Sequence, residues 1–362
     1  MFSLKPDFDS TRSRMDAFWA HDVLDRPMVS MDMLKPAAER RALPQSHHPD
    51  PAARWLDAAY QAEWALTDLG NHVFLGDTLP VACPNLGAEV FSALYGCPIH
   101  YGEGSSSWTE PILEDWSQAG RLRINWDSPV LNKMLEITDA LLAAGQGKFI
   151  TGMPDWHPGG DAIAAFRGPQ RLVMDLMEHP DEVKALLTRL EGDYYKLYDL
   201  FYKKMRAARQ PVTTRTHLFS DERFQILSND FAMMASKELF DAFFLEGITR
   251  ECQYLDHSIY QLDGPGALRH LDSILSVHEL DALVCGAGNE GIDEWMRVYQ
   301  KAQAAGKGIQ VHCELNEIKQ ISETLSPRGL YLCVKSVPDR DTGLALLKTL
   351  EDWTADYVGK VY

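Results

Sequence analysis

Short apolar runs alternate with longer amphipathic segments from residue 147 onward. The segment that begins at Pro180 is the clearest helix, because Val183, Leu186, Leu190 and Tyr194 recur on one face with a period near 3.6 residues. Strands are predicted between such helices, because each apolar run is short and several are stopped by glycine or proline. The six predicted strands are 148–152, 212–217, 258–263, 281–285, 308–313 and 329–334.

Two further strand candidates lie earlier, at 27–31 and 72–75. Strands that alternate with helices are typical of a parallel sheet with right-handed crossovers. Together these units predict an α/β fold, a single (β/α)8 TIM barrel over residues 1–362. An irregular stretch rich in Gly, Pro and Ser, at about 80–127, is expected to pack on this barrel. Neither a GxGxxG after the first strand nor a GxxxxGK[ST] loop occurs, which argues against the common nucleotide-binding folds.

Composition narrows the class of protein further. A formal net charge of −17 argues against a nucleic-acid partner, which calls for a basic face. The 6 cysteines show no CxxC pair, which is typical of a reducing compartment. The first residues lack an apolar signal core and no apolar run is long enough for a membrane helix, so we expect a cytoplasmic protein without a membrane partner.

Ionisable side chains gather at the ends of the predicted strands. A (β/α)8 barrel places its active site at the carboxyl ends of its strands, so several of these residues are expected to line one pocket. Others are expected only to cap helices or to bond loop backbone. The residues at strand ends are Asp32, Asp77, Asp155, Trp156, His157, His217, Asp263, Cys285, His312, Cys313, Glu314 and Lys335.

Asp263 stands out because Gly264, Pro265 and Gly266 follow it. Glycine lets the backbone approach a ligand closely, so Asp263 is a candidate catalytic residue that points into the mouth of the barrel. The alternative is that it caps the helix that follows. A similar glycine turn is predicted at 286–290.

His217 and His312 end two predicted strands, and histidine suits general acid/base catalysis or metal ligation. With Cys285 and Cys333, His312 is a candidate for a zinc site of mixed N and S ligands. A buried histidine that is only hydrogen-bonded is the commoner case. Trp156, among other aromatic residues near loops, is a candidate wall of a ligand pocket.

Several segments resemble the uroporphyrinogen decarboxylase-like superfamily. Residues 228–244 read SNDFAMMASKELFDAFF, which is similar to its Asp-Phe pair followed by an SPE-x-F-x-x-F helix. Residues 260–272 read YQLDGPGALRHLD, similar to YHLDGPGALRHLD in an anaerobe-rich branch. LYGCP at 94–98 and WTEPI at 108–112 also fit that branch.

This resemblance implies a single (β/α)8 barrel and one of two chemistries, porphyrinogen decarboxylation or corrinoid-linked methyl transfer. The decarboxylases carry an N-terminal RQAGR signature, whereas residues 26–32 here read RPMVSMD, so a true uroporphyrinogen decarboxylase is not expected. The methyltransferases of the family use zinc held by a His-x-Cys pair and a later Cys. Gln261 stands in the histidine position and Asp263 in that of the first cysteine, and Cys333 or Ser336 lies near the later position. The family zinc set is therefore not intact, although a glutamine amide can hold a substrate.

Three interpretations follow. The first is a methyltransferase-like enzyme that moves a methyl group between a small methylated substrate and a corrinoid cofactor on a partner protein. The second is a lyase, a decarboxylase of a small or tetrapyrrole-like acid, which calls for basic residues such as Arg215, Arg269 or Lys335 in the mouth. The third is a binding protein without catalysis.

Under the enzyme interpretations, Asp263, His312 and His217 are the expected catalytic residues, and a homodimer is possible. The residues expected to bind the substrate are Asp32, Asp77, Trp156, His157, Arg215, Gln261 and Glu314.

Overall fold

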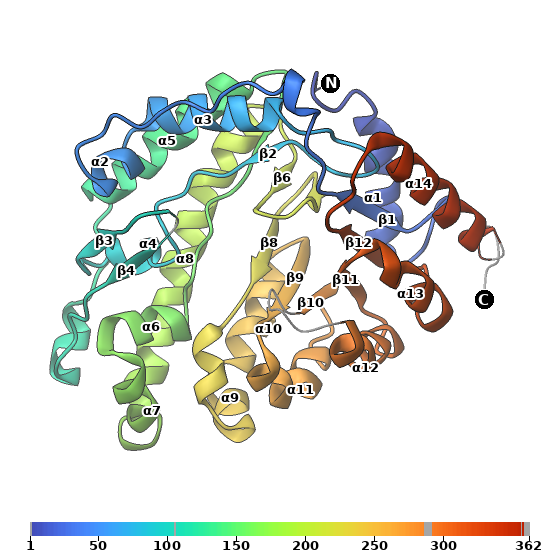
Figure 1. Cartoon of the computed structure of the whole chain (residues 1–362). Coiled ribbons are helices and arrows are strands. Elements are labelled where there is room, and N and C mark those ends of the chain that lie inside the picture. Colours follow the sequence, from blue (N-terminus) through green and yellow to red (C-terminus); the bar gives the residue numbers. More distant parts are fainter. Residues whose placement is uncertain (1, 105, 286–291, 356, 358–362) are drawn as a thin grey trace.

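The computed structural model describes residues 2–104, 106–285, 292–355 and 357. Most strands lie in the middle of the molecule, with helices around them (Figure 1). The strands are β1 (Met28–Met31), β2 (Val81–Ala82), β3 (Ile99–Tyr101), β4 (Ser107–Thr109), β5 (Ile150–Thr151), β6 (Val212–Thr213), β7 (Phe219–Ser220), β8 (Phe224–Leu227), β9 (His257–Leu262), β10 (Ala282–Cys285), β11 (Gly308–Cys313) and β12 (Leu330–Val334).

The helices account for most of the remaining chain. They are α1 (Phe8–Trp19), α2 (Pro51–Trp55), α3 (Ala58–Gly70), α4 (Val90–Ala93), α5 (Pro129–Gly145), α6 (Gly160–Arg167), α7 (Pro169–Glu178), α8 (Pro180–Ala207), α9 (Lys237–Phe243), α10 (Leu245–Tyr254), α11 (Leu271–Leu275), α12 (Ile292–Ala304), α13 (Ile318–Thr324) and α14 (Arg340–Thr354).

A six-stranded parallel sheet forms the centre, in the order β1-β12-β11-β10-β9-β8. Most residues of its strands are apolar and buried, as in β10, where all residues are buried. Such strands are typical of parallel sheets that are covered on both sides. The predicted α/β fold with a parallel sheet is therefore confirmed, and β9 to β12 lie where the sequence predicts them.

Shorter contacts continue from β1 around to β6. Gly76 forms an isolated bridge with Ser30, and β2 pairs in parallel with β5. The Met153 amide donates to the Thr213 carbonyl at 2.7 Å, which joins the segment after β5 to β6. Among the described residues, the strand pairs β2–β5 and β6–β7 are separate from the six-stranded sheet, so the strand pairings do not form a closed barrel. The eight-stranded barrel therefore stays a prediction.

Three local predictions differ from the structure. Residues 72–75 form no named strand, since His72 makes only an isolated bridge to Leu34. The strand expected at 212–217 stops at Thr213, because the Thr213 hydroxyl donates to the Leu218 carbonyl at 2.6 Å and the chain turns back as β7. The sequence analysis missed β8, whose apolar run is interrupted by the buried Gln225.

The excursion at 80–127 carries α4, the antiparallel β3–β4 hairpin and a 3-10 turn, Trp116–Arg121. Phe91, Leu113 and Trp116 are buried in the same hydrophobic cluster as the strands. The Leu113 amide donates to the Phe166 carbonyl at 2.8 Å, so this segment is tied to α6. Within the described chain, no helix combines the length and the apolar character needed to cross a bilayer.

Candidate functional site

A cavity of about 440 Å³ lies at the carboxyl edge of the six-stranded sheet, and we call it the mouth cavity. It receives side chains from the ends of β1, β9, β10, β11 and β12, because parallel strands present these ends to one side. Of the residues predicted for the site, those that line it are Asp32, Arg215, His217, Gln261, Cys285, His312, Cys333 and Lys335.

Two neutral histidines lie in this wall. Burial lowers the pKa of His217 to about 4, and its Nδ1 lies 3.0 Å from both the amide nitrogen and the carbonyl oxygen of Leu79. Burial, with a smaller effect of Lys335, also lowers the pKa of His312. The Nε2 atom of His312 lies 3.2 Å from the Gln310 amide nitrogen. Both rings are therefore uncharged at neutral pH and suit hydrogen bonding to a ligand.

The two cysteines predicted as metal ligands also face the mouth cavity. Burial raises the pKa of Cys333 to about 11 and raises that of Cys285 still further. Both thiols are thus protonated at neutral pH in the absence of a cation. Among the described residues, potential metal-ligand atoms come within 4.8 Å of one another in a group of three other residues, His157, Asp161 and Asp230, and this group lies outside the mouth cavity. A zinc site at His312, Cys285 and Cys333 stays a prediction.

Charged groups of both signs line the mouth cavity. Lys335 follows β12 and is exposed, whereas Asp32 follows β1 and Asp68 comes from α3. Burial, with the nearby negative charge of Asp32, raises the pKa of Asp68. The sequence analysis missed Asp68 because it lies within a helix rather than at a strand end. The feature of the sequence that could have indicated Asp68 is its spacing of four residues from His72, which also lines the cavity.

Arg215 joins the mouth cavity to a second polar region. Its Nη2 donates to Gln261 Oε1 at 2.8 Å, and its Nε lies 2.9 Å from Asp155 Oδ2. The same carboxylate oxygen is 3.5 Å from His157 Nε2. Arg215, His157 and their hydrogen bonds lower the pKa of Asp155 against the opposing effect of burial. Gln261 therefore presents its oxygen to a guanidinium group.

An aromatic cavity of about 680 Å³ adjoins the mouth cavity and shares Asp68 and Leu69 with it. Trp55, Tyr60 and Trp64 line it, from α2 and α3. Flat aromatic walls next to a polar cavity suit a ligand with an apolar body and a polar end.

Other predicted site residues lie outside the mouth cavity. Asp77 is fully buried and pairs with Arg26 at 2.6 Å. Trp156 is buried and packs edge-on against Phe201. Glu314 caps the 3-10 turn Leu315–Glu317 through a capping box with Glu317. Each of these three contacts has a structural role.

Asp263 is half-buried and does not line the mouth cavity, and it is not the cap of the following 3-10 turn, Pro265–His270, whose cap position is Gly264. Burial is the main cause of the raised pKa of Asp230, and the negative charge of Asp263 adds to it, so Asp263 lies near Asp230. The second predicted glycine turn, 286–290, lies outside the described residues. His157 lines a side cavity of about 400 Å³, to which Glu89, Thr109, Asp161 and Asp230 also contribute.

Comparisons with known proteins point to the fold. No family model matches the chain, and no curated protein sequence matches it. A solved structure, a methyltransferase from Methanosarcina mazei, is similar with a TM-score of 0.60 and 11% sequence identity. The match covers 97% of this chain and 99% of that chain. At this identity the likeness shows that the two proteins share a fold along nearly their whole length.

Proposed function

We propose that this protein is a methyltransferase-like enzyme that moves a methyl group between a small substrate and a corrinoid carried by a partner protein. The mouth cavity carries this proposal, because it gathers Lys335, Asp68 and His312 at the carboxyl edge of a parallel sheet. The likeness to the Methanosarcina mazei methyltransferase supports the class of reaction. We also propose that the six-stranded sheet is the larger part of a (β/α)8 barrel, which the contacts of residues 76–82 and 150–153 support.

The corrinoid is expected to approach over the aromatic cavity. A bound corrinoid supplies a cobalt atom that accepts or releases the methyl group. Trp64 has 39% of its surface exposed beside this cavity, and its flat ring can face a planar macrocycle. At about 680 Å³ the cavity fits the edge of such a ring, so the substrate would lie in the adjoining mouth cavity.

The residues present do not fit the family zinc site. Gln261 Oε1 accepts a hydrogen bond from Arg215, and Asp263 lies away from the mouth cavity. We therefore propose acid/base catalysis in place of zinc. Asp68, whose pKa is raised by burial, would donate a proton to the heteroatom that loses the methyl group, and in the opposite direction its carboxylate would accept the proton of the heteroatom that gains it. His217 and His312, which are neutral, would orient that heteroatom, and Lys335 would bind an acceptor oxygen of the substrate.

A decarboxylase is the second candidate. Arg215 and Lys335 both line the mouth cavity, as binding of a carboxylate requires. Arg215 is already paired with Asp155, however, and Arg269 is exposed and donates to the Gly266 carbonyl. Of these three basic residues, Lys335 is then left to bind a substrate carboxylate. Because a decarboxylase calls for several basic residues in the mouth, methyl transfer is the better supported proposal.

The test supplies methylcobalamin as methyl donor to the full chain, together with a panel of thiols, amines and phenols. Mass spectrometry detects the methylated product, and a parallel assay measures CO2 release from small carboxylic acids. We expect methyl transfer that falls about 100-fold in Asp68→Asn, the scale typical of a lost general base, because in this direction Asp68 accepts the proton of the methyl acceptor. Lys335→Met should raise KM.

The matched control is Lys319→Met, an exposed lysine of α13 that lines neither the mouth cavity nor the aromatic cavity and should behave as the wild type. CO2 release without methyl transfer would favour the lyase. Ligand binding without either product would support a non-catalytic binder, and both outcomes would contradict the proposal.

A further inference from the structure

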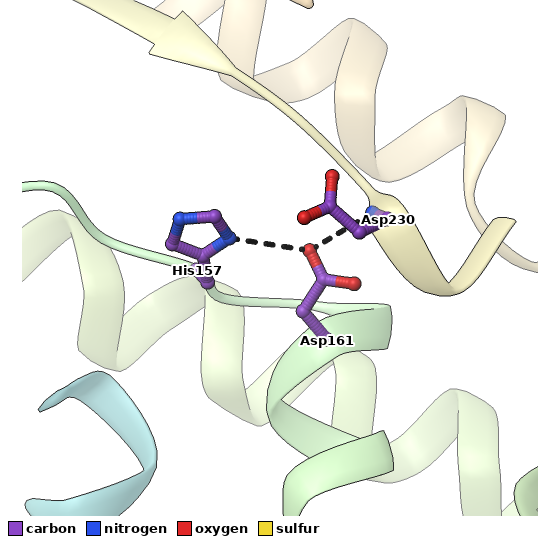
Figure 2. Close-up of side chains that lie close together, drawn as sticks. All are labelled: His157, Asp161 and Asp230. Atoms are coloured by element: carbon purple, nitrogen blue, oxygen red, sulfur yellow. Dashed lines mark hydrogen bonds and ion pairs between the residues drawn. The ribbon is translucent and has the colours of Figure 1, made fainter. Parts of the chain in front are cut away.

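Three side chains face one another in the wall of the side cavity (Figure 2). His157 comes from the loop before α6, Asp161 from the first turn of α6, and Asp230 from the chain just after β8. One ligand atom of each lies within 4.8 Å of the others, and His157 Nδ1 is 3.6 Å from Asp161 Oδ2. Ligand atoms around one ion, at bond lengths of ~2.0–2.2 Å, lie at comparable distances from one another.

Neighbouring groups hold two of these side chains in place. Asp161 accepts a hydrogen bond from the Asp230 amide at 3.2 Å (Figure 2). It also accepts one from the Phe231 amide at 2.8 Å, and together they fix its carboxylate. His157 presents its other ring nitrogen to Asp155, which is paired with Arg215. A carboxylate behind a histidine is the usual support of a metal-binding imidazole, because it fixes the ring and raises its basicity.

The cluster and its support hold more carboxylates than fixed cationic groups. Asp155, Asp161 and Asp230 contribute three carboxylates around His157, and the guanidinium group of Arg215 is paired with Asp155. A divalent cation held between His157, Asp161 and Asp230 would balance the charge of the two carboxylates that bind it.

We propose that His157, Asp161 and Asp230 bind one divalent transition-metal ion, Zn²⁺ or Mn²⁺, in the wall of the side cavity. An imidazole with two carboxylates suits these ions, whereas Mg²⁺ and Ca²⁺ favour oxygen ligands alone. Three protein ligands leave coordination positions open, as in catalytic metal sites, and the cavity of about 400 Å³ admits water or a ligand oxygen there. This inference is independent of the proposed methyl transfer.

The experiment measures metal binding by the full chain. Protein stripped with a chelator is dialysed against Zn²⁺ or Mn²⁺ alone, and elemental analysis and the Mn²⁺ paramagnetic resonance signal give stoichiometry and affinity. We expect one ion per chain, which an equal concentration of Mg²⁺ does not displace. Asp230→Asn, an exposed position that keeps its shape, should lower the affinity at least ~10-fold.

Asp155→Asn tests the support behind His157 and should lower the affinity by ~10–100-fold. Asp341→Asn, an exposed aspartate in the first turn of α14, is the matched control and should bind as the wild type. Circular dichroism of each variant excludes unfolding as the cause. Absence of bound ion in the wild type would overturn the proposal. So would zinc that is lost in Cys333→Ser but kept in Asp230→Asn, because the ion would then lie in the mouth cavity.

Discussion

His217 shows how burial changes the chemistry of a single residue. Its ring lines a polar cavity, yet its pKa is lowered to about 4 because the folded chain withdraws it from water. The hydrogen bond with Leu79 needs only one ring nitrogen. The histidine is therefore suited to hydrogen bonding rather than to carrying charge.

This shift predicts a dependence of stability on pH. The folded pKa, about 4, is below the unfolded value of 6.5, so the unfolded chain binds the proton first as the pH falls. Stability from this group is complete above pH 6.5 and is lost between there and about pH 4. The loss corresponds to about 3 kcal/mol. His217→Asn, measured by urea unfolding at pH 7 and pH 4, should lose correspondingly less stability than the wild type.

The control for this measurement is His47→Asn, an exposed histidine, which should follow the wild type at both pH values. If His217→Asn also follows the wild type, the ring is protonated in the folded state and the pKa assignment is wrong.

The loop after β9 depends on one glycine. Gly264 has φ of 70° and ψ of 164°, a backbone conformation that is accessible almost only to glycine. Gly266, two residues later, has no such restriction, and a Cβ there would meet only Met233 at 3.9 Å. In the DGPG motif, the backbone conformation thus requires glycine at the first glycine position, whereas the second position has room for a side chain.

Gly264→Ala is therefore expected to lower the free energy of unfolding by about 1–3 kcal/mol through backbone strain. Gly266→Ala is the matched control and should change it by less than about 1 kcal/mol. Chemical denaturation of both variants measures the difference. Equal stability of the two variants would show that the loop does not require a positive φ at residue 264.

At the scale of the whole molecule, a buried ion network ties β1 to its neighbours. Asp77 is fully buried and pairs with Arg26 at 2.6 Å and with Arg14 at 3.3 Å, while it also accepts from the Val29 amide at 3.0 Å. Lys5, also fully buried, contacts the Gly76 carbonyl at 2.5 Å. These contacts join α1, β1 and the segment before β2.

Asp77→Asn should destabilise the protein by about 3–5 kcal/mol, because the buried Arg26 then lacks a counter-charge. Asp25→Asn is the control: Asp25 also pairs with Arg14 but is 42% exposed, and its loss should cost about 1 kcal/mol or less. Thermal and urea unfolding compare the two variants. Unchanged stability of Asp77→Asn would contradict the structural role of Asp77 and would favour the substrate-binding role that the sequence suggests.

The amino-acid sequence by itself determined the parallel α/β core. Strands β9 to β12 and helix α8 were predictable because apolar runs and helical periodicity are local signals. Strand β8 was missed because its buried Gln225 breaks such a run, and the strand depends on pairing with β9. The strand-end rule also found Asp32, Cys285 and His312 in the mouth cavity.

Only the tertiary structure decided which side chains meet. Asp68 comes from a helix, and Asp230 lies 69 residues after Asp161, so no spacing in the chain brings Asp230 beside His157 and Asp161. Asp77 follows residues 72–75, which were predicted as a strand but form none, and its side chain is fully buried and paired with Arg26. The reason is physical: secondary structure follows from neighbours in sequence, whereas the orientation, burial and charge of a side chain depend on segments packed against it from elsewhere in the chain.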